Sequence, residues 1–177
     1  MSNTPITLSY ANEDDRAFGL AGMAISIAAL DALDRVSSIT LDSDGPMVTF
    51  SNQYYFAVSP SVSPKAVWDN LLRNFQITST MVLSNVMARS LVRAHTEVPE
   101  EVLAEIRAGI EEEGRNTCEL EADEIDAFYQ RMLAYSRRIF ANPRIHPAVE
   151  NFARTISLRR SLSGREIAEE MEMLQLI

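Results

Sequence analysis

Cysteine, lysine and histidine are scarce in this chain of 177 residues. The single cysteine, Cys118, cannot form a disulfide within the chain, which is compatible with the reducing cytoplasm. Nothing near Cys118 in the sequence would lower its pKa, so a nucleophilic role is disfavoured. His95 and His146 are the only histidines, and the sequence names no partner for either. Histidine-based acid–base catalysis therefore has no support from the sequence.

Motifs of common enzyme classes are also missing. There is no glycine-rich phosphate loop, no Gly-x-Ser-x-Gly elbow, no His-Glu-x-x-His and no cysteine pair. The turn at 42–45 superficially resembles the start of a calcium loop, but Pro46 follows it and Gln53 stands where the bidentate glutamate belongs. His95 with Glu97 supplies only two metal ligands. The sequence thus predicts no catalytic residue, no metal and no cofactor, and favours a non-catalytic protein over an enzyme.

Long apolar runs and a net positive charge are absent as well. The longest apolar stretch covers residues 17–30, which is too short to span a bilayer, and acidic residues precede it, unlike in a signal peptide. The net charge of −9 disfavours general binding to nucleic acid or to anionic membranes. We therefore expect a soluble, cytoplasmic protein with no membrane partner.

The apolar content that is present suits one compact domain over residues 1–177, because 46% of the residues are hydrophobic and only 6 are glycine. The longest periodic segment predicts a helix over residues 64–94, with Ser63 as its N-cap and Pro64 at its first position. An apolar stripe on this helix is predicted to face the core; it consists of Trp68, Leu71, Leu72, Phe75, Val82, Leu83 and Val86.

The opposite face of the same helix is uncharged, which is typical of a covered face rather than a solvated one. The cover is either the helix rich in small residues over 17–30, whose small side chains let another helix approach closely, or a second chain. The candidate interface in the second case consists of Asn70, Asn74, Ile77, Met81 and Asn85.

The remaining patterns predict an α+β, mainly α fold, with about six helices around the long central helix (64–94) and a small three-stranded antiparallel meander (36–58). The third strand of the meander is predicted over 54–58. The other helices are expected at about 12–35, 99–113 with Gly114 as its stop, 122–141, from Pro147 onward, and from Ser163 onward with Glu166 completing a capping box. Residues 6–10 have the alternation of a short strand or an extended arm.

Charge divides the C-terminal half into two regions. Residues 97–126 carry twelve acids against two arginines, and residues 127–165 carry eight arginines against Glu150 alone. The two regions either pair within the fold or face partners. The candidate patch for an acidic partner consists of Arg154, Arg159, Arg160 and Arg165.

Three functional hypotheses follow, and the sequence identifies no ligand, substrate, partner or oligomeric state. The first is a non-catalytic protein-interaction or assembly module that binds another protein or itself. The second is an enzyme or small-ligand binder with a pocket between meander and helices, lined by Tyr54, Tyr55, Trp68 and His95. The third, nucleic-acid binding through residues 131–165, is disfavoured because four glutamates follow Arg165 in the last helix and would be repelled by DNA.

Overall fold

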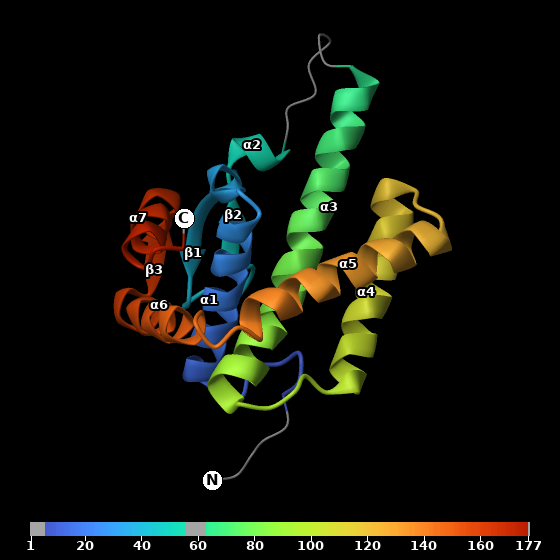
Figure 1. Ribbon diagram of the computed structural model, residues 1–177. Coiled ribbons are helices and arrows are strands. Elements are labelled where there is room, and N and C mark those ends of the chain that lie inside the picture. Colours follow the sequence, from blue (N-terminus) through green and yellow to red (C-terminus); the bar gives the residue numbers. More distant parts are fainter. Residues whose placement is uncertain (1–5, 56–62, 177) are drawn as a thin grey trace.

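Helices make up most of the computed structural model, which describes residues 6–55 and 63–176 (Figure 1). The helices are α1 (Glu13–Ala29), α2 (Asn52–Tyr55), α3 (Pro64–Met87), α4 (Glu100–Cys118), α5 (Ala122–Phe140), α6 (His146–Arg159) and α7 (Gly164–Met173). A 3-10 turn (Leu33–Arg35) precedes the sheet, and a π-helical segment (Ala88–Ala94) extends α3. The strands are β1 (Val36–Thr40), β2 (Val48–Phe50) and β3 (Ser161–Ser163). The predicted α+β, mainly α class is confirmed.

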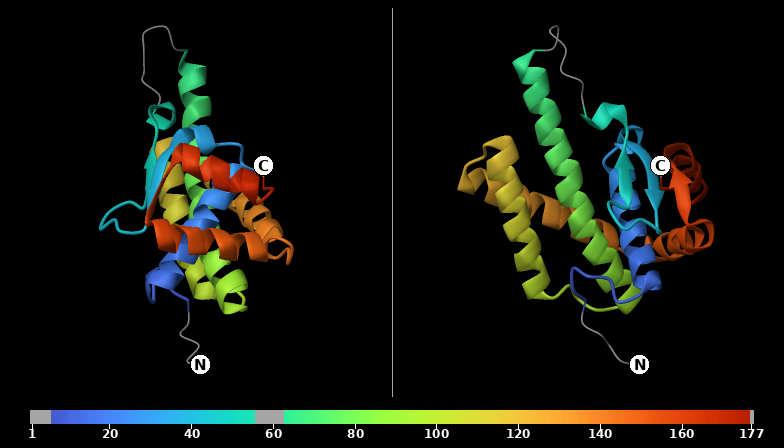
Figure 2. Two further views of the ribbon diagram at one scale, coloured as in Figure 1. Left: turned by 90° about the vertical axis from the view of Figure 1, so that its left-hand side faces the viewer. Right: turned by 180° about the vertical axis from the view of Figure 1, so that it is seen from behind.

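Helix α3 runs through the centre of the arrangement. Helix α1 packs along one side of it, and α4 and α5 pack on the others. Figures 1 and 2 show α6 and α7 beyond α1, on the side away from α4. The predicted helix over 64–94 is therefore present as one continuous rod, although its last two turns are π-helical rather than α-helical.

Small residues allow α1 to approach α3 closely, as the sequence indicated. A Cβ atom at Gly19 would lie 2.6 Å from the Asn85 side chain, and one at Gly22 would overlap the Ser84 carbonyl oxygen. Ile77 and Met81 on α3 are buried. The uncharged face of α3 is thus covered within the chain by α1, which was the first of the two expected covers.

The polar members of that face have partners inside the chain too. Arg35 donates to the side-chain oxygens of Asn70 and Asn74, each at 2.7 Å. Asn85 is 7% exposed and donates to the Tyr10 hydroxyl at 2.8 Å. The five residues of the candidate interface therefore make contacts within this chain.

The apolar stripe of α3 is only partly buried. Phe75, Leu83 and Val86 lie in the core, but Trp68 is 38% exposed and Val82 is 41% exposed. No residue of α3 before Phe75 is buried. The placement of Trp68 and Val82 in the core was wrong, because the first turns of α3 extend past the other helices (Figure 2) and α1, α4 and α5 leave Val82 uncovered.

The sheet has the strand order β2-β1-β3, so its third strand is not the predicted one. Tyr54 and Tyr55 lie in α2, and residues 56–58 fall outside the described residues. The strand that pairs with the free edge of β1 is β3, in antiparallel register with Ile39 opposite Leu162. Both of these side chains are 1% exposed. The contact between β1 and β3 thus joins segments far apart in the sequence and buries this cross-strand apolar pair.

Local signals placed most helix ends correctly. The Asn12 side chain accepts a hydrogen bond from the Asp15 N–H, Ser63 accepts one from the Ala66 N–H, and Ser163 with Glu166 forms the predicted capping box. Two predicted helix ends were wrong. Helix α1 ends at Ala29 rather than near residue 35, because Asp31 has a positive φ of 52° and Leu33–Arg35 form a separate 3-10 turn. Gly114 does not end α4, which continues through it to Cys118. A Cβ there would lie 3.1 Å from the Phe75 ring, so this glycine serves close packing rather than termination.

A buried ion pair joins α1 to the π-helical segment. The Arg89 and Asp15 side chains are 1% and 0% exposed, with Nε–Oδ1 at 2.9 Å and Nη2–Oδ2 at 2.7 Å. Arg89 also donates to the carbonyl oxygens of Thr7 and Ser9 and lies over the Tyr10 ring. Residues 6–10 are therefore held as an arm on this arginine, and they form no strand.

Within the described residues, no helix is long and apolar enough to cross a bilayer.

Candidate functional site

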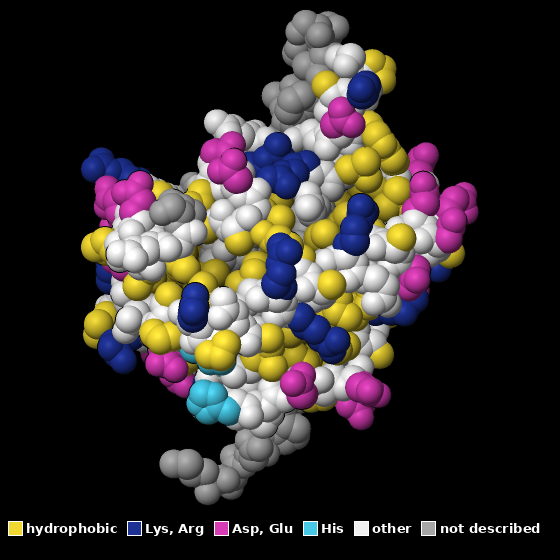
Figure 3. Space-filling view, in the orientation of Figure 1, with side chains coloured by type: hydrophobic (Ala, Val, Ile, Leu, Met, Phe, Trp, Pro, Cys, Tyr) yellow, Lys and Arg dark blue, Asp and Glu magenta, His cyan; other side chains and the backbone are white. Residues whose placement is uncertain are grey.

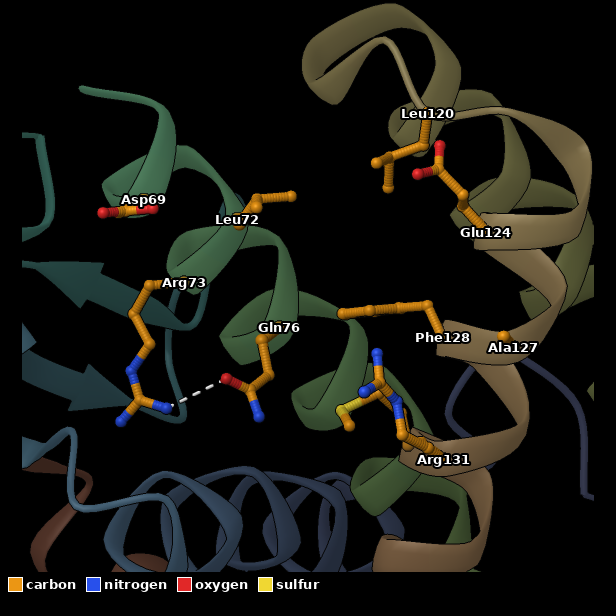
Figure 4. Close-up of a pocket in the computed structure, with 10 residues that line it drawn as sticks. Asp69, Leu72, Arg73, Gln76, Leu120, Glu124, Ala127, Phe128 and Arg131 are labelled. Atoms are coloured by element: carbon orange, nitrogen blue, oxygen red, sulfur yellow. Dashed lines mark hydrogen bonds between the residues drawn. The ribbon is translucent and has the colours of Figure 1, made fainter. Parts of the chain in front are cut away.

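A recess with a volume of about 840 Å³ lies between α3 and α5 (Figures 3 and 4). We call it the α3–α5 groove. Its lining consists of Asp69, Leu72, Arg73 and Gln76 from α3, Leu120 from the loop before α5, and Glu124, Ala127, Phe128, Arg131 and Met132 from α5.

The floor of the groove is apolar because α5 crosses α3 through aromatic packing. The Phe128 ring stacks on the Phe75 ring, with centroids 4.5 Å apart, and Gly114 leaves room for the Phe75 ring. Leu72 and Leu120 point into the same space as Phe128 and extend this surface (Figure 4). Leu72, Leu120 and Phe128 pack against the core and are only partly buried, so part of their apolar surface remains accessible in the groove.

Four charged residues surround this floor. Asp69 and Arg73 belong to α3, and Glu124 and Arg131 belong to α5. Arg73 donates to the Gln76 side chain at 2.9 Å, and Arg131 lies over the Phe128 ring at 5.9 Å. The rim therefore carries two negative and two positive side chains, which balance each other.

Apolar surface continues from the groove onto the projecting end of α3. Trp68 precedes Leu72 by four residues, so the two side chains lie on the same face of the helix. Of the Trp68 surface, 38% is exposed. A short helical end with an exposed apolar face is weakly stable alone and gains from a partner.

The four residues predicted to line a pocket do not meet at one place. Tyr54 and Tyr55 line a second recess of about 310 Å³ between α2, α3 and α4, which we call the tyrosine pocket. Trp68 is not among its lining residues. His95 follows the π-helical segment at the other end of the rod, roughly 40 Å from Trp68 at the helical rise per residue.

Sequence reasoning missed the acidic residue of the tyrosine pocket. Glu113, from α4, lines it together with Asn70, Leu71, Asn74 and Phe75 from α3. Burial raises the pKa of the Glu113 carboxyl, and a hydrogen bond from Thr78 counteracts only part of that rise. The sequence offered no signal for this role, because Glu113 closes a run of three glutamates that resembles an ordinary solvated face.

Two other reactive side chains, Cys118 and His146, contact groups of the fold. Cys118 is buried, and burial together with the charge of Glu113 raises the pKa of its thiol, which disfavours the thiolate. His146 contacts the Phe140 carbonyl oxygen at 2.9 Å through its Nε2 atom. In residues 6–55 and 63–176, no group of three or more His, Cys, Asp or Glu side chains is arranged to hold a metal ion.

The acidic and basic regions do not pair with each other in the part of the chain that the structure describes. Arg107 and Arg115 pair with acids of the acidic region itself. In the predicted patch for an acidic partner, Arg159 pairs with Glu166 and Glu170, Arg160 with Glu13 and Asp42, and Arg165 with Glu169. Three of the four arginines in that patch thus already contact carboxylates of their own chain, which weakens the case for that patch as a site for an acidic partner.

No protein-family model matches this sequence, and no curated protein is significantly similar to it.

Proposed function

We propose that this chain is a non-catalytic protein-interaction module of the cytoplasm that assembles with a second copy of itself through the α3–α5 groove. The observation that carries the proposal is the apolar floor around Leu72 and Phe128, which continues onto the exposed Trp68 and is edged by balanced charges. Apolar surface of this kind, enclosed by a polar rim, is the usual anatomy of a protein interface.

The charge distribution favours a second copy over an unrelated partner. In a two-fold dimer, residue i of one copy contacts residue j of the other copy, and j of the first contacts i of the second. A charged rim that pairs with itself therefore needs residues of both signs. The groove meets this requirement with Asp69 and Glu124 against Arg73 and Arg131. In the described chain, no arginine of α5, such as the exposed Arg138, pairs with an acidic residue of α4. These charges therefore remain available to a second copy.

The projecting end of α3 supplies a segment for the contact. Trp68 and Leu72 on that end can enter the groove of the second copy, whose own α3 end then enters the first groove. This arrangement is a reciprocal form of helix-in-groove recognition. The free, buried Cys118 agrees with a reducing compartment such as the cytoplasm.

Size-exclusion chromatography with light scattering tests the assembly. The wild-type chain of 19.8 kDa is expected to approach twice its mass as the concentration rises. Leu72→Glu places a charge on the apolar floor and is expected to yield the monomer mass. Val82→Glu is the matched control, because Val82 lies on the same helix outside the groove and is 41% exposed. A wild-type chain that stays monomeric at high concentration would refute self-association.

The tyrosine pocket supports a second candidate function, the binding of a small ligand. The specific observation is that Glu113 and two tyrosines line one recess. A pocket with a few polar groups among apolar ones, including a carboxyl with a raised pKa, is the usual form of a ligand site.

A further inference from the structure

The walls of the tyrosine pocket are two aromatic rings held at a large angle to each other. The Tyr54 ring stacks on Phe50 with centroids 3.8 Å apart, which fixes its orientation. The Tyr54 and Tyr55 rings form a T-shaped pair, with an interplanar angle of 82° and a centroid distance of 5.4 Å. The pocket therefore has a corner formed by two tyrosines, and the electron-rich faces of such rings attract cations.

Hydrogen bonds hold this corner on α3. Asn74 donates to the Tyr54 carbonyl oxygen at 2.7 Å, and Asn70 approaches the same oxygen at 3.4 Å. The side-chain oxygens of both asparagines accept from Arg35. Arg35 is thereby occupied with the asparagines, and no ion pair between it and Glu113 is present among the described residues.

The Glu113 carboxylate is short of donors. Its one hydrogen-bond partner in the described chain is the Thr78 hydroxyl, at 3.3 Å. That hydroxyl also lies 3.1 Å from the Asn74 carbonyl oxygen and 3.2 Å from the Phe75 carbonyl oxygen. A hydroxyl has a single proton to donate, so the three acceptors compete for it and the longest contact is the one to Glu113.

A positively charged group in the pocket would supply the partner that the Glu113 carboxylate lacks. A half-buried carboxylate without a counter-ion is costly, and a cation placed beside it removes that cost. Leu71 and Phe75 provide apolar surface for the hydrocarbon part of such a ligand. The volume of about 310 Å³ lies at the small end of ligand pockets, so the ligand is small.

We propose that the tyrosine pocket binds a small organic cation, an alkylammonium or quaternary ammonium compound, with its charge between Glu113 and the rings of Tyr54 and Tyr55. A neutral ligand would leave the carboxylate unpaired, and an anion would be repelled by it. The site involves a different set of α3 side chains from the α3–α5 groove, so it stands independently of self-assembly.

Choline and its neutral carbon analogue, 3,3-dimethylbutan-1-ol, test the proposal because they share a shape and differ in charge. Isothermal titration calorimetry on the full chain is expected to show choline binding about tenfold more tightly than the neutral analogue. Two-dimensional NMR of the wild-type chain is expected to show choline-induced shifts at Tyr55, Glu113 and Thr117. Equal binding of the two compounds, no binding of choline in the millimolar range, or shifts confined to other regions would each overturn the proposal.

Substitutions then distinguish the contribution of the Glu113 charge to choline binding from that of the tyrosine rings. Glu113→Gln is expected to remove the preference for choline over the neutral analogue, whereas Glu112→Gln, a change at the exposed neighbouring residue, is expected to keep it. Tyr55→Ala is expected to weaken choline binding several-fold, since Tyr55 is 68% exposed and its loss leaves the core intact. Undiminished preference for choline in a folded Glu113→Gln chain would also overturn the proposal.

Discussion

At the scale of single residues, Asp15 and Arg89 form a buried ion pair that joins α1 to the π-helical segment. Removing two charges from water is costly, and the cost is repaid only when nearly every donor and acceptor has a partner. Here the Arg89 guanidinium reaches Asp15 and two carbonyl oxygens of the N-terminal arm. The pair therefore determines how the arm, α1 and the π-helical segment are joined.

We predict that Arg89→Met lowers the free energy of unfolding by about 3–5 kcal/mol, because Asp15 is left buried without its main partner. Urea denaturation followed by circular dichroism measures the loss. Arg165→Met is the control, since the ion pair of Arg165 with Glu169 is largely exposed and solvent screening leaves it little effect on stability. Equal losses in the two variants would contradict a structural role for the buried pair.

The same aspartate predicts a dependence of stability on pH. Burial alone would raise the pKa of Asp15, but hydrogen bonds from Arg89 and from the Ala11 N–H, with the charges of Arg89 and Arg93, outweigh it and lower the pKa below its usual value. A lowered pKa contributes stability above the unfolded-state value of about 4, and this stability is lost as the pH falls through the folded-state pKa.

We therefore expect the free energy of unfolding to fall as the pH drops below about 4, and to fall less steeply in Asp15→Asn. Urea titrations at a series of pH values supply the comparison. Identical slopes for the two proteins would show that Asp15 does not carry the effect.

The pKa shift of Glu113 is opposite in sign to that of Asp15, since the pKa of Glu113 is raised in the folded chain. Its ionisation at neutral pH costs stability, and this cost disappears as the pH falls below the unfolded-state pKa of about 4.3. Glu113→Gln is expected to be more stable than the wild type at pH 7 and to lose this advantage near pH 4. Thermal melts at both pH values test it, and a less stable variant at pH 7 would contradict the expectation.

At the scale of elements, the contact between α1 and α3 depends on glycines whose missing Cβ atoms permit a close approach. Gly22→Ala would bring a methyl group to 2.6 Å from the Ala88 Cβ and onto the Ser84 carbonyl oxygen. The backbones must then separate, and we predict a loss of about 1–3 kcal/mol in the free energy of unfolding, despite the better helix propensity of alanine.

Gly109→Ala provides the matched control for this prediction. A Cβ at Gly109 meets nothing within 4 Å, and Gly109 lies inside α4, so the substitution is expected to stabilise by about 0.5–1 kcal/mol. The two variants should shift the urea midpoint in opposite directions. Shifts of the same sign would show that the approach of α1 to α3 is less tight than its geometry indicates.

At the scale of the whole molecule, the balanced rim of the α3–α5 groove predicts how assembly responds to charge. Arg131→Glu gives the rim three acids against one arginine, so dimerisation is expected to weaken about tenfold and to recover partly at high salt. Adding Asp69→Arg restores the balance with the signs exchanged and is expected to restore dimerisation. Sedimentation velocity measures the dissociation constants, and a double variant as weak as the single one would count against a two-fold contact.

The sequence by itself determined the approximate positions of the long helices and several of their N-caps, but not α2, whose tyrosines were assigned to a strand. Helical periodicity and side-chain capping act over only a few residues, as at Ser63 and at Ser163 with Glu166, so a single sequence contains them in full. The small residues of α1 likewise predicted close packing, because side-chain size alone limits how near two helices can come. Of the four residues predicted to line a pocket, Tyr54 and Tyr55 share one recess, since they are neighbours in the chain.

Only the tertiary structure decided which distant segments meet. It completed the sheet with β3 instead of residues 54–58, paired Asp15 with Arg89, placed Glu113 beside the tyrosines and left His95 far from them. These contacts join segments dozens of residues apart, and their stability comes from shared burial and charge pairing across the fold. Local patterns carry no information about such pairs, because every strand, acid and arginine has several acceptable partners until the chain is packed.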